Sequence, residues 1–288
     1  MDSNSIAGEL ARFRTPDGVE LHGFLKHCTN RKGAIVYLHG LCGTFYRNYY
    51  IYRMAEDASK AGIGFLSIEQ RGSYVALGFS KNGKRRFMAG GAFERFEDSA
   101  MDIRGAIGFL RGKGYRNIFL VGHSTGCQKA AYYTWKTGDR NVKALVLLAP
   151  ADDYNISRIG MGKVFRPAVA YAKMAGIHSI MPEKYTKQMF SAGRFLSFSD
   201  PGRKEARIFN YNRRRLSEFS RIRIPILAIF GSDEQYADRP VVEYLDILER
   251  NTSSRKFSRM VIKGADHGFR GKDAILSKTV VGWLKEFR

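Results

Sequence analysis

The chain has 288 residues, of which 44% are hydrophobic and 26% are charged. This composition excludes a disordered tail, and the length is sufficient for a core that needs no disulfides. No run approaches the roughly 18 apolar residues that a membrane-spanning helix requires, so we expect no membrane span. At about 100–200 residues per domain, the chain is one large domain or one domain with an insertion.

The charge balance is strongly basic. Lys and Arg number 48 against 27 Asp and Glu, which gives a formal net charge of +21. Such an excess favours acidic ligands, an anionic membrane or nucleic acid as partners. The basic residues are spread along the chain, however, and no nucleic-acid module signature is present. We therefore do not expect nucleic acid as a partner.

The cysteines and the first residues bear on location. Cys28, Cys42 and Cys127 are odd in number and widely spaced, which is typical of a reduced compartment. The start of the sequence lacks the basic and apolar regions of a secretory signal. Both features predict a cytoplasmic protein, and the sequence leaves a homodimer open.

Short apolar runs predict the strands of a buried sheet. Residues Ala11–Phe24 contain two short strands around the turn at Asp17-Gly18. Six further runs are apolar on both faces, as in a parallel sheet. They are Ala34–Leu38, Ile63–Ile68, Ile118–Val121, Ala144–Ala149, Ile224–Phe230 and Met260–Ile262.

Helical patterns alternate with these strands. Apolar residues between Phe96 and Leu110 recur at spacings of three and four, and Thr125–Trp135, Pro240–Leu248 and Ser277–Phe287 also read as helices. Alternating strands and helices predict an α/β fold with right-handed βαβ crossovers and helices on both faces of the sheet.

The alternation stops between Asp152 and Arg221. This stretch contains three prolines, several glycines and short helix-like pieces, and it is too long for an ordinary connection. We expect residues 152–221 to form a small helical cap, and residues 1–151 and 222–288 to form the core. A surface insertion without a function is the alternative.

The most specific motif is Gly122-His123-Ser124-Thr125-Gly126. It follows an apolar run and precedes a helical pattern, which is the strand–turn–helix context of a G-x-S-x-G nucleophile elbow. The serine occupies a sharp turn that has no room for neighbouring side chains, which explains the glycines at positions 122 and 126. We expect the hydroxyl of Ser124 to be the nucleophile and the side chain of His123 to point away from the active face.

A serine hydroxyl needs a base that accepts its proton. Among the six histidines, His267 follows the last apolar run on a loop that precedes the final helix. That position favours it as the base. A structural hydrogen bond is its alternative role.

An acid should orient the imidazole and stabilise its cation. The loop Gly231-Ser-Asp-Glu-Gln-Tyr236 follows the preceding strand and offers two candidates. We favour Glu234, because it lies three residues past the glycine that ends the strand. Asp233 is the alternative, and Asp152 or Asp153, after an earlier strand, are the remaining ones.

Two backbone N–H groups should bind the oxyanion of a tetrahedral intermediate. One is expected from Thr125, the residue after the nucleophile. The other is expected from Leu41, in the loop His39-Gly40-Leu41-Cys42-Gly43, where the identity of the side chain does not matter. We interpret Cys42 and Cys127 as small packing residues.

In chain order the motifs are an oxyanion loop, a serine elbow, an acidic loop and a late histidine. This order resembles the α/β-hydrolase superfamily over nearly the whole chain. The resemblance implies a mostly parallel central sheet flanked by helices, with the cap at 152–221. The string from Gly122 to Gln128, GHSTGCQ, is similar to a branch of esterase-like hydrolases that includes fungal enzymes acting on ester-linked siderophores. Members of that branch usually have Gly-x-x-Asp in the acid loop, where this chain has Glu234.

The resemblance also narrows the chemistry. Dehalogenases and epoxide hydrolases of this fold use an Asp nucleophile, whereas this chain has Ser124. The hypothesis is a serine hydrolase that cleaves carboxylic esters through an acyl-enzyme, without a metal or an organic cofactor. The substrate is a small ester or acyl compound, and basic residues of the cap favour an anionic one. The alternatives are a thioesterase, a peptidase of the same fold, and a non-catalytic binding scaffold with a basic surface.

Overall fold

A computed structural model describes residues 5–287. Eight strands form one sheet in the order β1-β2-β4-β3-β7-β8-β9-β10. The pairs from β4 to β10 are parallel, and only β1–β2 and β2–β4 are antiparallel. The strands are β1 (Glu9–Arg14), β2 (Glu20–Lys26), β3 (Gly33–Leu38), β4 (Ile63–Ile68), β7 (Asn117–His123), β8 (Val142–Leu148), β9 (Ile226–Gly231) and β10 (Phe257–Ile262).

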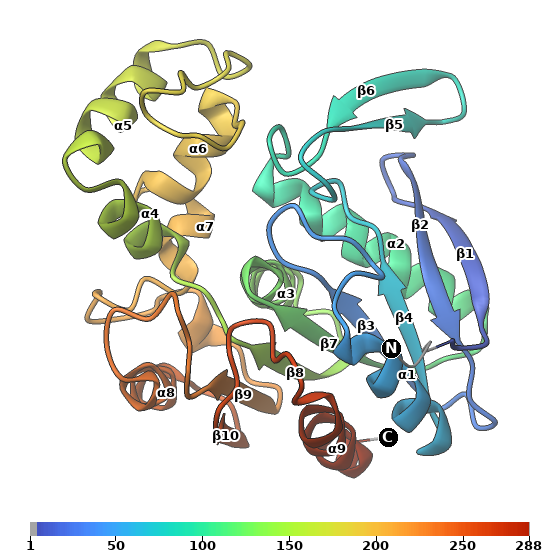
Figure 1. The fold of residues 1–288 in the computed structure, drawn as a ribbon. Helices are drawn as coiled ribbons and strands as arrows, with labels where there is room; N and C mark the ends of the chain where they lie inside the picture. The colour runs from blue at the N-terminus through green and yellow to red at the C-terminus, as the bar shows by residue number, and fades with distance from the viewer. Residues whose placement is uncertain (1–4, 288) are drawn as a thin grey trace.

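Burial explains why the central strands are apolar throughout. Every residue of β3, β4 and β9 is buried, because helices cover both faces of the sheet. The helices include α1 (Tyr50–Lys60), α2 (Ser99–Gly112), α3 (Thr125–Thr137), α8 (Val241–Asn251) and α9 (Asp273–Leu284). Helix α1 packs against α9 and α2 against α3, and Figure 1 shows these pairs on opposite faces of the sheet. The α/β-hydrolase fold predicted from the sequence is confirmed.

One helix and one hairpin of the fold were not predicted from the sequence. Helix α1 connects β3 to β4, as a parallel pair requires. Strands β5 (Leu77–Lys81) and β6 (Arg85–Ala89) form a separate antiparallel hairpin that stands apart from the main sheet in Figure 1. Its turn, Asn82-Gly83, has positive φ at both residues and is a strong hairpin signal that the sequence analysis passed over.

The long connection between β8 and β9 is mainly helical. It contains α4 (Asp153–Met161), α5 (Phe165–Met174), α6 (Ala192–Ser199) and α7 (Lys204–Ile208), which lie to one side of the sheet in Figure 1. Residues between Ala168 and Phe198 form an apolar cluster of their own. Residues from Ile208 to Phe219 instead belong to the main core. The part with a separate core is therefore shorter than the predicted insertion, residues 152–221.

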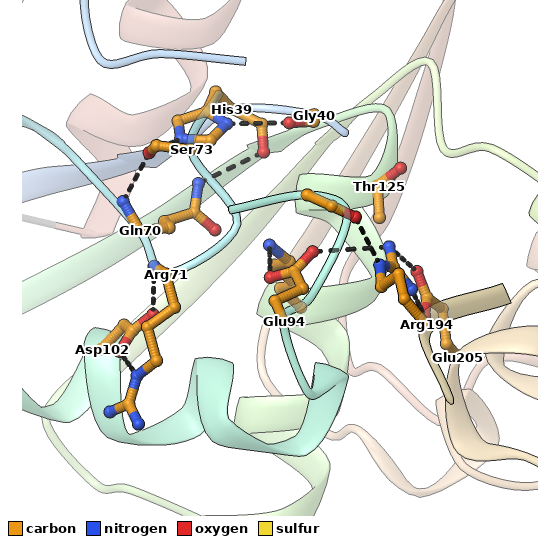
Figure 2. A network of polar contacts seen from close by, with 12 residues as sticks. His39, Gly40, Gln70, Arg71, Ser73, Glu94, Asp102, Thr125, Arg194 and Glu205 are labelled. Carbon is orange, nitrogen blue, oxygen red and sulfur yellow. Dashed lines mark hydrogen bonds and ion pairs between the residues drawn. The ribbon is translucent and has the colours of Figure 1, made fainter. Parts of the chain in front are cut away.

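Buried ion pairs fasten this helical insertion to the rest of the molecule. Arg194 of α6 is 1% exposed and pairs with Glu205 of α7 through both carboxylate oxygens. The same guanidinium lies 3.4 Å from Glu94 and donates to the carbonyl of Gly91, and Glu94 accepts from Lys129 of α3 at 2.7 Å (Figure 2). Arg194 thus joins the insertion to a core loop and, through Glu94, to the helix that follows the elbow.

Replacing Arg194 with Met should destabilise the protein by about 3–5 kcal/mol, because Glu94 and Glu205 would lose a buried cation. Urea unfolding measures the change. Arg166→Met, at an exposed position of α5, is the control and should change stability by less than about 0.5 kcal/mol. Equal stability of the two variants would contradict the fastening role of Arg194.

Candidate active site

Ser124 lies in the tight turn that joins β7 to α3. Its backbone has φ 55° and ψ −127°, a conformation that costs energy for a residue other than glycine. A Cβ at Gly122 would lie 2.4 Å from the carbonyl oxygen of Gly126, and one at Gly126 would lie 2.2 Å from that of Leu38. Both positions therefore require glycine, because neighbouring backbone atoms occupy the space that a side chain would need. Together the two glycines permit the strained turn.

His267 and Glu234 come from the loops after β10 and β9. Nδ1 of His267 lies 2.9 Å from both carboxylate oxygens of Glu234, and the two side chains are 12% and 3% exposed. Because an ionised carboxylate only accepts hydrogen bonds, Nδ1 is the donor, which leaves Nε2 free to act as an acceptor. The backbone N–H of His267 also donates to Oε1 of Gln235 at 3.0 Å.

The alternative acids lie elsewhere. Asp233 is exposed, and its carboxylate accepts a hydrogen bond from the hydroxyl of Ser232 at 2.7 Å. Asp152 caps the start of α4 by accepting from the N–H of Asn155. Asp153 accepts from Gln128 and Thr125. Of these carboxylates, only that of Glu234 contacts the ring of His267.

One cavity of about 480 Å³ brings the predicted site residues together. Ser124, Thr125, Leu41 and His267 all line it. Thr125 is the first residue of α3, so its N–H has no acceptor within the helix. The insertion supplies most of the apolar wall, and none of the cavity-lining residues is a Lys or Arg. Apolar side chains in this wall include Ile156, Met161, Phe190, Phe195 and Phe198.

A hydrogen-bonded chain holds the predicted oxyanion loop (Figure 2). His39 donates from Nδ1 to the carbonyl of Gly40 at 2.8 Å, and its Nε2 accepts from the hydroxyl of Ser73 at 2.7 Å. Ser73 accepts in turn from the backbone N–H of Gln70. Burial, reinforced by the charge of Lys129, lowers the pKa of His39 to about 4, so the ring is neutral. The hydrogen bonds therefore fix the tautomer of His39, and through that tautomer the ring holds the loop in place.

The side chain of Leu41 has a contact that the sequence analysis did not anticipate. It packs against the apolar cluster of the insertion. Its backbone can still serve the expected role, but substituting Leu41 would disturb the contact between loop and insertion. Cys42 adopts φ 53°, and Cys127 is fully buried, with its thiol donating to the carbonyls of Gly122 and Leu148.

The orientation expected for His123 is wrong. Its side chain does not point away from the site, because Nε2 donates to the backbone carbonyl of His267 at 2.8 Å and the two rings lie 5.0 Å apart. Burial, and then the neighbouring His267, lower the pKa of His123 to about 3, which keeps the ring neutral. Tyr236 packs edge-on against the ring of His267 at 4.8 Å. Neither neighbour of His267 was predicted, because both contacts depend on the folding of distant loops.

A family model described as "Protein of unknown function (DUF1749)" matches residues 1–286. The chain belongs to this family. A search of the curated proteins gave no significant match.

Solved structures with the same fold include several hydrolases. Est1E from Butyrivibrio proteoclasticus, bound to ferulic acid, is 16% identical with a TM-score of 0.70, and the match covers 96% of this chain and 99% of that one. The siderophore hydrolase EstB from Aspergillus fumigatus is 17% identical with a TM-score of 0.70 over both full chains. A monoacylglycerol lipase from Paleococcus ferrophilus is 20% identical with a TM-score of 0.64, covering 93% and 99%. At these identities the likeness establishes the fold.

The position of Ser124 should depend on the lack of a side chain at Gly40. A Cβ there would lie 2.9 Å from Cβ and 3.4 Å from Oγ of Ser124. We expect Gly40→Ala to slow the labelling of Ser124 by a fluorophosphonate probe by about tenfold or more, since small misplacements of a reacting group are costly. Mass spectrometry of the labelled peptide measures the rate.

Gly108→Ala is the matched control, because a Cβ at Gly108 meets no atom within 4 Å. Its labelling rate should equal that of the natural protein. If Gly40→Ala also reacted at that rate while remaining folded, the steric constraint on Ser124 would be contradicted.

Proposed function

We propose that the protein is a serine hydrolase that cleaves carboxylic esters through an acyl-enzyme. The observation that carries the proposal is the pair of Glu234 and His267, whose ring lines the same cavity as the strained Ser124. The esterases and lipase of the same fold support ester hydrolysis as the reaction class. The binding-scaffold alternative is disfavoured because a scaffold requires no such pair beside a strained serine.

In the proposed mechanism, Nε2 of His267 accepts the proton of Ser124 as its oxygen attacks the ester carbonyl. Glu234 holds Nδ1–H and stabilises the imidazolium that forms. Backbone N–H groups of Thr125 and Leu41 stabilise the oxyanion. His267 then protonates the leaving alcohol, and a water molecule, deprotonated by the same ring, hydrolyses the acyl-enzyme.

We further propose that the helical insertion acts as a cap that selects the substrate. Its aromatic side chains, Phe190, Phe195 and Phe198, provide a wall for an apolar acyl or alcohol group. The anionic substrate expected from the net charge has no support in the cavity, because no basic side chain lines it. Exposed basic residues of the insertion, such as Lys163 and Arg166, lie outside this lining.

Removing the nucleophile tests the reaction. Ser124→Ala should lower kcat/KM for p-nitrophenyl esters by about 10⁴-fold or more and abolish fluorophosphonate labelling. A panel of graded acyl chains, with an acyl-CoA and a peptide amide beside them, separates an esterase from a thioesterase or a peptidase. Unchanged ester turnover by the folded variant would refute the mechanism.

The assignment of the acid is tested by two neighbouring substitutions. Glu234→Gln should lower kcat/KM by about 10³- to 10⁴-fold, because an amide stabilises neither the required tautomer nor the imidazolium. Asp233→Asn is the control and should stay within about threefold, since that side chain is exposed and does not contact His267. The reverse ranking would assign the role to Asp233.

A further inference from the structure

One carboxylate lines the cavity, and it is not that of Glu234. Asp153, the first residue of α4, is half-buried and lines the cavity that contains Ser124. Its Oδ2 accepts from Gln128 at 2.7 Å and from the hydroxyl of Thr125 at 3.2 Å. No described residue donates to Oδ1. The carboxylate is therefore held on one side and has an unused acceptor on the other.

The charges around Asp153 do not balance. Four carboxylates belong to this group: the buried Glu94, Glu205 and Asp152, and the half-buried Asp153. Only two cations, Lys129 and Arg194, belong to it. When Asp153 is ionised, the carboxylates of the group outnumber its cations.

The protonation of Asp153 reflects this imbalance. Burial, and then the nearby charge of Glu205, raise the pKa of Asp153 to about 7. A carboxylate at a helix start normally gains stability from the helix dipole, so burial and Glu205 outweigh that effect here. The fully buried Gln128 also has an amide oxygen with no donor among the described residues. This part of the molecule therefore has fewer cations than carboxylates and a buried acceptor without a donor.

The rest of the cavity fits a small cation. Phe190 and Phe195 line it, and aromatic faces attract cations, whereas the ring of Phe198 already has the guanidinium of Arg194 5.3 Å from its centre. No Lys or Arg is among the lining residues, so the protein itself supplies no cation that reaches Oδ1 from the cavity. The overall charge of +21 is therefore not carried into the place where the substrate would bind.

We propose that Asp153 binds an ammonium group of the substrate, so that this enzyme prefers esters bearing an amine a few bonds from the scissile carbonyl. The inference rests on the proposed ester hydrolysis and names its substrate class. The ammonium donates to Oδ1 of Asp153, adds a cation to this group of carboxylates and lies against the aromatic wall. Asp153 in this role is a specificity-determining residue and takes no part in bond cleavage.

Matched esters test the preference in the natural protein. Ethyl esters of ω-amino acids are compared with ethyl esters of the ω-methyl, ω-hydroxy and ω-carboxy acids of the same length, from short to medium chains, in a pH-stat. Acetate esters of dimethylamino alcohols and of their branched alkyl analogues test the alcohol side. We expect one ammonium ester to exceed its alkyl analogue in kcat/KM by about tenfold or more, with the carboxylate esters slowest.

Asp153→Asn removes the negative charge and keeps the size of the side chain. An asparagine can keep its oxygen toward the donors Gln128 and Thr125, and it then presents an NH₂ group to the cavity in place of an acceptor. The ratio of kcat/KM between the ammonium and alkyl esters should fall by about tenfold or more. Glu183→Gln removes the same charge from an exposed position of the insertion and should leave the ratio unchanged.

The ratio of kcat/KM between the ammonium and alkyl esters should also rise with pH. Asp153 is neutral below a pH of about 7 and negative above it, so the preference for the ammonium ester increases from about pH 6 to 8. Glu205, Asp152 and Arg194 act electrostatically on Asp153, and Arg194 keeps its charge over this range. Taking the ratio of two esters cancels any pH effect on the bond-cleaving steps that the two esters share.

The outcomes are distinguishable. Equal kcat/KM for ammonium and alkyl esters at every length in both series would overturn the role of Asp153, while ester hydrolysis would stand. Equal loss of the preference in Asp153→Asn and Glu183→Gln would also overturn it, by indicating a surface effect. Failure of a fluorophosphonate to label Ser124, with no turnover of any ester, would overturn the proposed function and this inference together.

Discussion

The site depends on one strained turn. Ser124 adopts a positive φ between a buried strand and a helix, and two glycines make the close backbone contacts that the turn requires. The parallel sheet on either side has little freedom to relax, because its central strands are buried on both faces. The fold thus supplies the energy that keeps the hydroxyl in an otherwise unfavourable position. The loops after β3, β9 and β10 reach the serine because parallel strands end at the same edge.

Three side chains determine the electrostatic environment of Ser124: two neutral histidines and one carboxylate that is paired with His267. His39 and His123 are buried and uncharged, and each donates a hydrogen bond to a backbone carbonyl of a site loop. Glu234 supplies the negative charge behind His267. Among the residues that line the cavity there is no Lys or Arg, and Asp153 is the one acidic residue. The basic excess of the sequence is therefore not found in the lining of the cavity.

Much of this could be predicted from the sequence because it rests on local patterns. The apolar runs located the main strands to within a few residues, and the flanking strand and helix identified the turn at Ser124. Strand β9 begins at Ile226, later than predicted, where Pro225 offers no N–H. The contacts of His123, Arg194 and Asp153 were not predictable, since each joins segments far apart in the chain. Glu234 was favoured over Asp233 by its loop position, and its contact with His267 depends on the folded loop.

The ion pairs of Arg194 have a consequence for ligand entry. An insertion held by fully desolvated charges does not swing open cheaply, since separating them would expose each ion without its partner. We therefore expect a small molecule to enter the cavity without the insertion swinging away. On this view no slow gating motion of the helices limits the encounter with a ligand.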